Sequence, residues 1–210
     1  MNEIDHPAIS KFFNIIVPEY ILPDLSTLRI DVRPDDLIYQ SGCTVATAMM
    51  CFSIIDLIGY LINPDINTKK RNTSENMEYA FSKSAGLFPA EYAKYSEILI
   101  KIFRHGIMHQ IFPKASGISK PHPPNDSLIF YITGDKPHLN VDVLTDDIIE
   151  ILVDFYVILE NNNELATRME ERLSILQKDD AEQLSEFRNV LDSESDKIKI
   201  TYTTTTTTTA

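Results

Sequence analysis

The sequence predicts an all-α protein with a short two-stranded insertion. Only six of its 210 residues are glycine, which is few for a chain built from strands and tight turns, and 43% of the residues are hydrophobic. Apolar residues recur every three or four positions along several long segments, as they do in amphipathic helices. We expect one helical domain over residues 1–160, an acidic helical extension over 161–200 and a disordered threonine-rich tail over 201–210.

The first expected helix covers residues 4–20. Its apolar positions have helical spacing and are Ile9, Phe12, Phe13, Ile16 and Val17. Pro18 and Pro23 should end this helix, because proline lacks the amide hydrogen that a helix interior requires. Residues 21–39 contain further prolines and turn residues, so we expect an irregular connection there.

A second helix is expected over residues 42–62, which are apolar on every face. The run is almost long enough to span a bilayer, so a membrane span must be weighed against a buried helix. Asp56 lies near its middle and no positive charge flanks its start, which favours a central buried helix. A buried carboxylate needs a partner, and the alternatives for Asp56 are Arg104 and a nearby backbone group.

Two helices should follow in the next part of the chain. Thr73 or Ser74 can cap a helix that runs to about Ser84. Another helix should run from Pro89 to Phe112, since proline is favoured in a first helical turn.

The C-terminal half begins with two strand-like runs, residues 128–133 and 138–143, which a Gly-Asp-Lys turn connects. They predict the two-stranded insertion. Thr145 should then cap a strongly amphipathic helix. Residues 142–196 contain 16 acidic and 4 basic residues, so this end of the chain should repel nucleic acid.

The segment of residues 101–120, KIFRHGIMHQIFPKASGISK, has no Asp or Glu, although the whole chain has a formal net charge of −12. It holds four fixed positive charges, among them Arg104, and the histidines His105 and His109. A basic surface can bind a phosphate or a carboxylate, and imidazoles titrate near neutral pH, so they can transfer protons beside it. We expect the functional site here, in the C-terminal half of a helix.

In the sequence FRHGIMHQ, Arg104 is followed by the polar His105, and four residues separate Arg104 from His109. This motif resembles the signature of the HEPN domain family. The resemblance covers roughly residues 8–160, because the upstream apolar helix and the downstream strands and helix also look like one branch of that family. It implies a HEPN-like bundle of four or five helices.

The resemblance also implies a metal-independent endoribonuclease, in a toxin or defence context, whose site forms where two copies meet. His109 would transfer protons, Arg104 would hold the phosphate, and His105 would orient both. RNA would be the substrate, the chain would be a homodimer, and no cofactor or metal would be used. An antitoxin or nucleotidyltransferase partner is compatible with this interpretation. No basic region followed by an apolar run opens the chain, so we expect a cytoplasmic protein without a membrane partner.

Two alternatives stay open beside the ribonuclease. Many members of the family lack activity, so the chain can also be a non-catalytic interaction module whose basic segment docks on an acidic partner or on its own acidic end. His105 and His109 are four residues apart and share a helix face, which also suits zinc, although no third ligand is obvious. On an ideal helix Arg104 and His109 lie about 140° apart, so a single site needs a bend at Gly106 or two copies.

Overall fold

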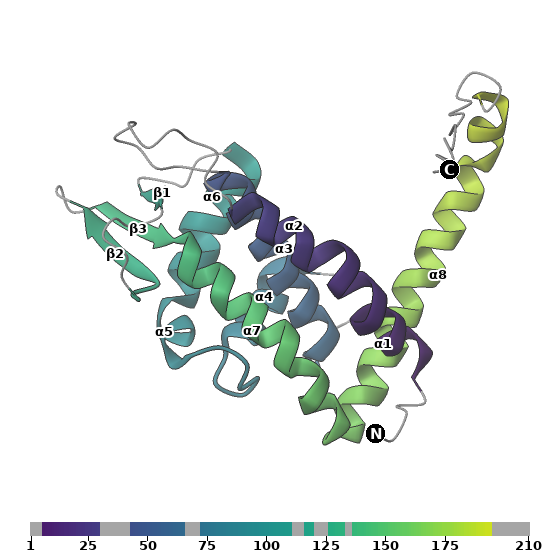
Figure 1. The fold of residues 1–210 in the computed structure, drawn as a ribbon, viewed down its shortest axis with the longest axis horizontal. Coiled ribbons are helices and arrows are strands. Elements are labelled where there is room, and N and C mark those ends of the chain that lie inside the picture. The colour runs from purple at the N-terminus through teal and green to yellow at the C-terminus, as the bar shows by residue number, and fades with distance from the viewer. Residues whose placement is uncertain are drawn as a thin grey trace, which may run out of the picture. The chain divides into compact units, whose positions relative to one another are not determined.

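The structure is a computed structural model in which the placed residues are 6–29, 43–65, 72–110, 116–119, 126–132 and 136–194. Over these residues it is mostly helical (79%), with six continuous helices and a small three-stranded mixed sheet (Figure 1). The helical fold class predicted from the sequence is confirmed. The chain divides into two units, Met1–Arg172 and Leu173–Ala210.

The N-terminal helix is longer than the sequence predicts. It combines three elements, α1 (Pro7–Lys11), η1 (Phe12–Ile21) and α2 (Leu22–Arg29). The middle element is a π-helix, and Pro18 lies inside it. In a π-helix the bonding is i→i+5, so the carbonyl four residues before proline, with which its ring would clash in an α-helix, is no longer the one aligned with it. The predicted end at Pro18 is therefore wrong, and so is the irregular connection over residues 21–29. Residues 30–39 lie outside the described residues.

Helix α3 (Thr44–Ile62) is the central helix of the first unit. It packs against α2, α4 (Thr73–Phe81) and α7 (Val141–Glu160), and Figure 1 shows α2 and α7 alongside it. By length and composition α3 could cross a membrane, but 61% of its most apolar window is buried inside the protein. The burial favours the interpretation of α3 as a core helix.

Gly59 allows α4 to approach α3 closely. A Cβ atom at Gly59 would lie 2.0 Å from the backbone oxygen of Asn76, far inside van der Waals contact. Asn76 is fully buried, and its Nδ2 donates a hydrogen bond to Oδ1 of Asp56 at 2.6 Å. Asp56 and Gly59 are three residues apart and face the same neighbour. Gly59, which has no side chain, and the carboxylate of Asp56 therefore both hold α4 against α3.

Helix α4 begins after Asn72, whose side chain accepts a hydrogen bond from the backbone N–H of Ser74 at 3.1 Å. The cap thus lies one residue before Thr73, the first of the two caps predicted. The next helix is continuous and consists of α5 (Ala90–Ile98), the π-helix η2 (Leu99–Arg104) and α6 (His105–Gln110). Gly106 lies inside α6, so the helix continues through it. The predicted end at Phe112 is outside the described residues.

The insertion is a three-stranded sheet, so the two-stranded prediction is wrong. Its strands are β1 (Gly117–Ser119), β2 (Ile129–Ile132) and β3 (Lys136–Asn140), in the order β1-β3-β2. β3 pairs antiparallel with β2 and parallel with β1. A Cβ atom at Gly117 would lie 2.1 Å from the His138 ring, so glycine leaves room for this ring on the neighbouring strand. β1 has three residues, too few for a strand pattern to show in the sequence.

Helix α7 follows β3 directly. The side chain of Asn140 caps it by accepting hydrogen bonds from the backbone N–H groups of Asp142 and Val143, at 3.2 and 3.4 Å. The predicted cap at Thr145 is wrong. Thr145 is buried one turn later, where its hydroxyl donates to the carbonyl of Val141 at 2.6 Å and lies 3.6 Å from Sγ of Cys51 on α3.

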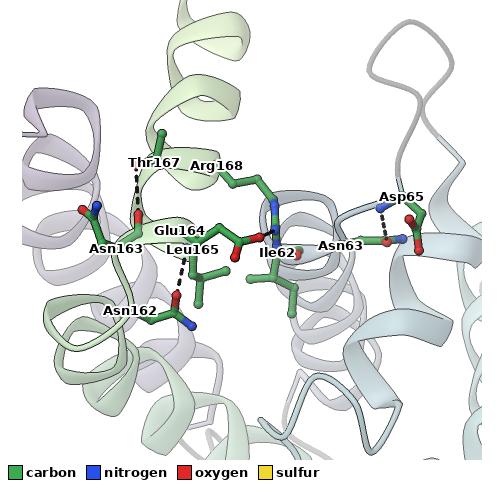
Figure 2. A network of polar contacts seen from close by, with 9 residues as sticks. All are labelled: Ile62, Asn63, Asp65, Asn162, Asn163, Glu164, Leu165, Thr167 and Arg168. Atoms are coloured by element: carbon green, nitrogen blue, oxygen red, sulfur yellow. Dashed lines mark hydrogen bonds and ion pairs between the residues drawn. The ribbon is translucent and has the colours of Figure 1, made fainter.

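The first ten residues of α8 (Asn163–Glu194) belong to the first unit. Arg168 donates through Nη1 to the carbonyl of Ile62 at 2.9 Å and through Nη2 to Glu164 at 2.7 Å (Figure 2). Arg172 donates to the carbonyl of Tyr60. The last four carbonyls of a helix have no partner within it, and positive charge is favourable at that end. Two arginines of α8 therefore cap the C-terminus of α3.

Replacing Gly59 with alanine tests the close approach of α3 and α4. Alanine is the better helix former by about 1 kcal/mol, so without the contact the variant would gain stability. We expect instead a loss of about 1–3 kcal/mol in the free energy of unfolding, because the added methyl group overpacks the interface. Urea unfolding measures it. Ser53→Ala, which adds the same residue at an exposed position of α3, should stay within about 0.5 kcal/mol of the wild type. A stabilised Gly59→Ala variant would contradict the packing.

Candidate functional site

Arg104, His105 and His109 lie at the junction of η2 and α6. Arg104 is the last residue of the π-helix, and the two histidines are one turn apart on α6. The side chains of Arg104 and His105 are half-buried, and that of His109 is exposed. None of the three belongs to the buried core, so their presence is not a consequence of core packing.

The two histidines lie together. Their ring centroids are 5.9 Å apart and the rings are inclined at 68°. Nε2 of His105 lies 3.4 Å from Oγ of Ser74, in the first turn of α4. The expectation that His105 and His109 share a helix face is confirmed, and α4 supplies a hydroxyl that orients one of the rings.

Arg104 lines a cavity of about 130 Å³ that does not include either histidine. Its other lining residues are Phe52, Ser53 and Asp56 of α3, Thr73 of α4 and Met108 of α6. The partner of Asp56 is neither of the two expected from the sequence alone: Asn76 of α4 donates a hydrogen bond to its carboxylate. Within one copy, the structure thus brings the two histidines together and brings Arg104 to the cavity of Asp56, but it does not bring Arg104 and His109 into one cavity.

The basic segment is not free of negative charge in three dimensions. Lys101 forms an ion pair with Glu97 one turn earlier on the helix, at 2.6 Å, and both side chains are exposed. Asp56 faces the cavity that Arg104 lines. Lys114 and Lys120 lie outside the described residues. Residues 101–120 contain no Asp or Glu, but carboxylates from other parts of the chain lie close to them and offset part of their positive charge.

The zinc alternative receives no further ligand from the part of the chain that the structure describes. Within it, no group of three or more His, Cys, Asp or Glu side chains could hold a metal ion. His138 lies in β3 with Nδ1 3.1 Å from Oγ of Ser119. Burial lowers the pKa of His138, and the charge of Lys136 lowers it further. His122 lies outside the described residues.

A larger cleft, of about 330 Å³, opens between α7 and the loop Gly86–Pro89. Three carboxylates of α7 line it, those of Asp147, Glu150 and Asp154, beside the apolar side chains of the loop. Gly86 has a φ of 65°, a conformation that favours glycine at this position of the loop. Asp147 does not stand out in the sequence, because no local pattern indicates which loop covers its helix.

Asp147 is the most constrained carboxylate of this cleft. The hydroxyl of the buried Tyr92 donates to its Oδ2 at 2.5 Å. Burial raises the pKa of Asp147; the Tyr92 hydrogen bond opposes this, and the nearby carboxylates of Glu150, Asp146 and Glu91 raise the pKa further. The charged form of Asp147 is therefore disfavoured in the folded protein.

Comparison of the chain with models of protein families, with curated proteins and with solved structures finds no match. The functional interpretation therefore depends on the site itself.

Asp147→Asn should raise the melting temperature at pH 7. The raised pKa means that the folded state holds the proton more tightly than the unfolded state, so ionisation of Asp147 costs stability above its folded pKa. The gain should shrink as the pH falls through the raised folded pKa and should vanish below the ordinary aspartate pKa, where wild-type Asp147 is protonated in both states. Asparagine keeps an acceptor for Tyr92. Thermal unfolding of both proteins between pH 3 and 8 measures the change in melting temperature. The control variant Glu160→Gln removes an exposed carboxylate from the same helix and should change the melting temperature less. A loss of stability at pH 7 would show that the hydrogen bond to the charged carboxylate outweighs burial.

Proposed function

We propose that this chain is a metal-independent endoribonuclease of the HEPN type, with Arg104, His105 and His109 as its site residues. The observation that carries the proposal is the placement of two adjacent imidazoles, 5.9 Å apart, directly after an accessible arginine, with His109 exposed to solvent. Core histidines would be buried and held by backbone groups. Two adjacent imidazoles, one half-buried and one exposed, next to an arginine in the chain are typical of a site that transfers protons next to an anion.

The proposed reaction is cleavage of RNA through its own 2′-hydroxyl. One histidine takes the proton of the 2′-hydroxyl, and the 2′-oxygen attacks phosphorus. The 5′-oxygen leaves with a proton from a second acid, which produces a 2′,3′-cyclic phosphate and a free 5′-hydroxyl. His109 is the group that exchanges protons, a role worth about 10²–10⁴ in rate. Arg104 binds the phosphate and stabilises the charge of the transition state.

The helix geometry supports a site made by two copies. Five residues of α-helix turn through about 500°, so Arg104 and His109 point about 140° apart on one helix. Gly106 lies inside α6 (His105–Gln110), so both sides of it keep helical geometry and the angle applies within one chain. A second copy can supply the missing partner for each residue. The π-helical turn before Arg104 also shifts this side chain relative to the preceding α-helical register.

One observation favours a second candidate, a non-catalytic interaction module. Arg104 shares its cavity with Asp56, and Lys101 is paired with Glu97. A phosphate would have to compete with these carboxylates for the two cations. A protein partner that presents its own carboxylates meets the same competition, but it does not need an Arg104 that is free for chemistry.

His109→Ala and Arg104→Ala should each lower RNA cleavage by about 10²-fold or more, while His105→Ala only weakens it. The assay follows a fluorescent single-stranded RNA in the presence of EDTA, since the reaction uses no metal. Lys101→Ala is the matched control, because it removes a cation of the same helix outside the motif and should retain most of the activity. Equal losses for Lys101→Ala and Arg104→Ala would indicate general attraction of RNA. Activity that EDTA abolishes and zinc restores would support the metal alternative instead.

Sedimentation velocity should find a dimer at micromolar concentration. Met108→Glu should convert it to a monomer and lower cleavage in parallel, because Met108 is an exposed apolar residue of the motif helix. Val153→Glu changes an exposed apolar residue of α7 and should leave the dimer intact. A Met108→Glu monomer that still cuts RNA at the wild-type rate would contradict the two-copy site.

A further inference from the structure

Helix α7 exposes an apolar ridge that none of the described residues of the first unit covers. Val153 and Val157, four residues apart, have exposed fractions of 59% and 56%, and Ile158 has 38%. At about 100° per residue, Val153 and Val157 lie on one side of the helix, next to Glu150 and Asp154. The ridge therefore borders the 330 Å³ cleft between α7 and the loop Gly86–Pro89. We call the ridge and the cleft together the α7 surface.

The charge of the α7 surface has one sign. The helix has six acidic residues and no Lys or Arg over Val141–Glu160. Asp147, Glu150 and Asp154 line the cleft, and Glu91 of α5 adds to the negative potential at Asp147. Close carboxylates repel one another, so a cation placed among them would relieve an unfavourable interaction. RNA and anionic lipid surfaces are excluded here because they carry the same charge.

The cleft has the chemistry to receive a long cationic side chain. Its loop side is apolar and includes Leu87, Phe88 and Pro89, while its helix side carries the carboxylates. Lys and Arg side chains have an apolar stem and a charged end, so their stem can lie on the loop while the end meets Glu150 and Asp154. On the same ligand, apolar side chains one helical turn from this Lys or Arg would then contact Val153 and Val157.

We propose that the α7 surface docks a cationic amphipathic helix of a protein partner, with one Lys or Arg side chain inserted in the cleft and apolar side chains on Val153 and Val157. Charge complementarity selects this occupant, since the surface combines an apolar ridge with carboxylates of one sign. The docking does not depend on the proposed ribonuclease activity. It uses a different helix from the one that bears Arg104 and His109.

The test is binding of a labelled synthetic peptide to the full chain, measured by fluorescence anisotropy. The peptide has about 18 residues, or five helical turns, with leucines on one face and lysines on the other. A scrambled peptide of the same composition separates amphipathic docking from general attraction. We expect the ordered peptide to bind at least about tenfold more tightly than the scrambled one, with an affinity that falls as salt increases.

Variants of the protein then locate the contact. Asp154→Asn and Val157→Ser should each weaken binding by about fivefold or more, since one removes a charge of the cleft and the other an apolar contact of the ridge. Glu78→Gln on α4 removes a carboxylate elsewhere and should change binding less than about twofold. Far-UV circular dichroism confirms that the variants fold. Equal binding of the ordered and scrambled peptides would overturn the proposal, and so would an equal loss for Glu78→Gln. Wild-type dimerisation that Val153→Glu abolishes would also overturn it, because a second copy would then cover the surface.

Discussion

The close approach of α3 and α4 at Gly59 and Asn76 is the constraint on which the candidate site depends. A side chain at position 59 would collide with the backbone of Asn76, so only glycine allows this spacing. The approach carries the first turn of α4 to the motif helix. Ser74 then reaches His105, and Thr73 joins the cavity that Arg104 lines. The missing side chain at Gly59 thus determines which hydroxyls of α4 lie beside the motif.

The carboxylate of Asp56 has two consequences for the site. Its hydrogen bond from Asn76 holds it near the middle of α3, where the carboxylate is half-buried and partly removed from water. It also places negative charge in the cavity of Arg104. A phosphate that binds Arg104 would have to compete with this carboxylate, which lowers the affinity of the site for RNA. A ribonuclease therefore needs the RNA phosphate to outcompete the Asp56 carboxylate at Arg104, whereas a protein-binding module does not.

The first unit presents two surfaces of opposite character on two different helices. The motif helix offers imidazoles and cations, partly offset by Glu97 and Asp56. The α7 surface offers carboxylates, exposed valines and an open cleft. An RNA chain would be attracted by the first and repelled by the second. The acidic surface is thus suited to a cationic protein, which could bind without occupying the motif.

The sequence by itself determined the helical class, the central helix around Asp56 and the histidine pair of α6, because each depends on local spacing along one helix. It could not determine the π-helix at Pro18, which requires knowing that neighbouring helices hold this segment together. The third strand was missed since a three-residue strand has no pattern of its own. The helix caps at Asn72 and Asn140 are single side-chain contacts, and nearby Ser and Thr residues are equally good cap candidates in the sequence.

Only the tertiary structure decided the remaining contacts. Asn76 binds Asp56, and Arg104 lines a cavity with a carboxylate instead of with His109. The loop Gly86–Pro89 lies opposite acidic residues of α7 and forms a cleft with them. These contacts join residues up to about seventy positions apart, and no local pattern encodes which distant side chain will lie opposite.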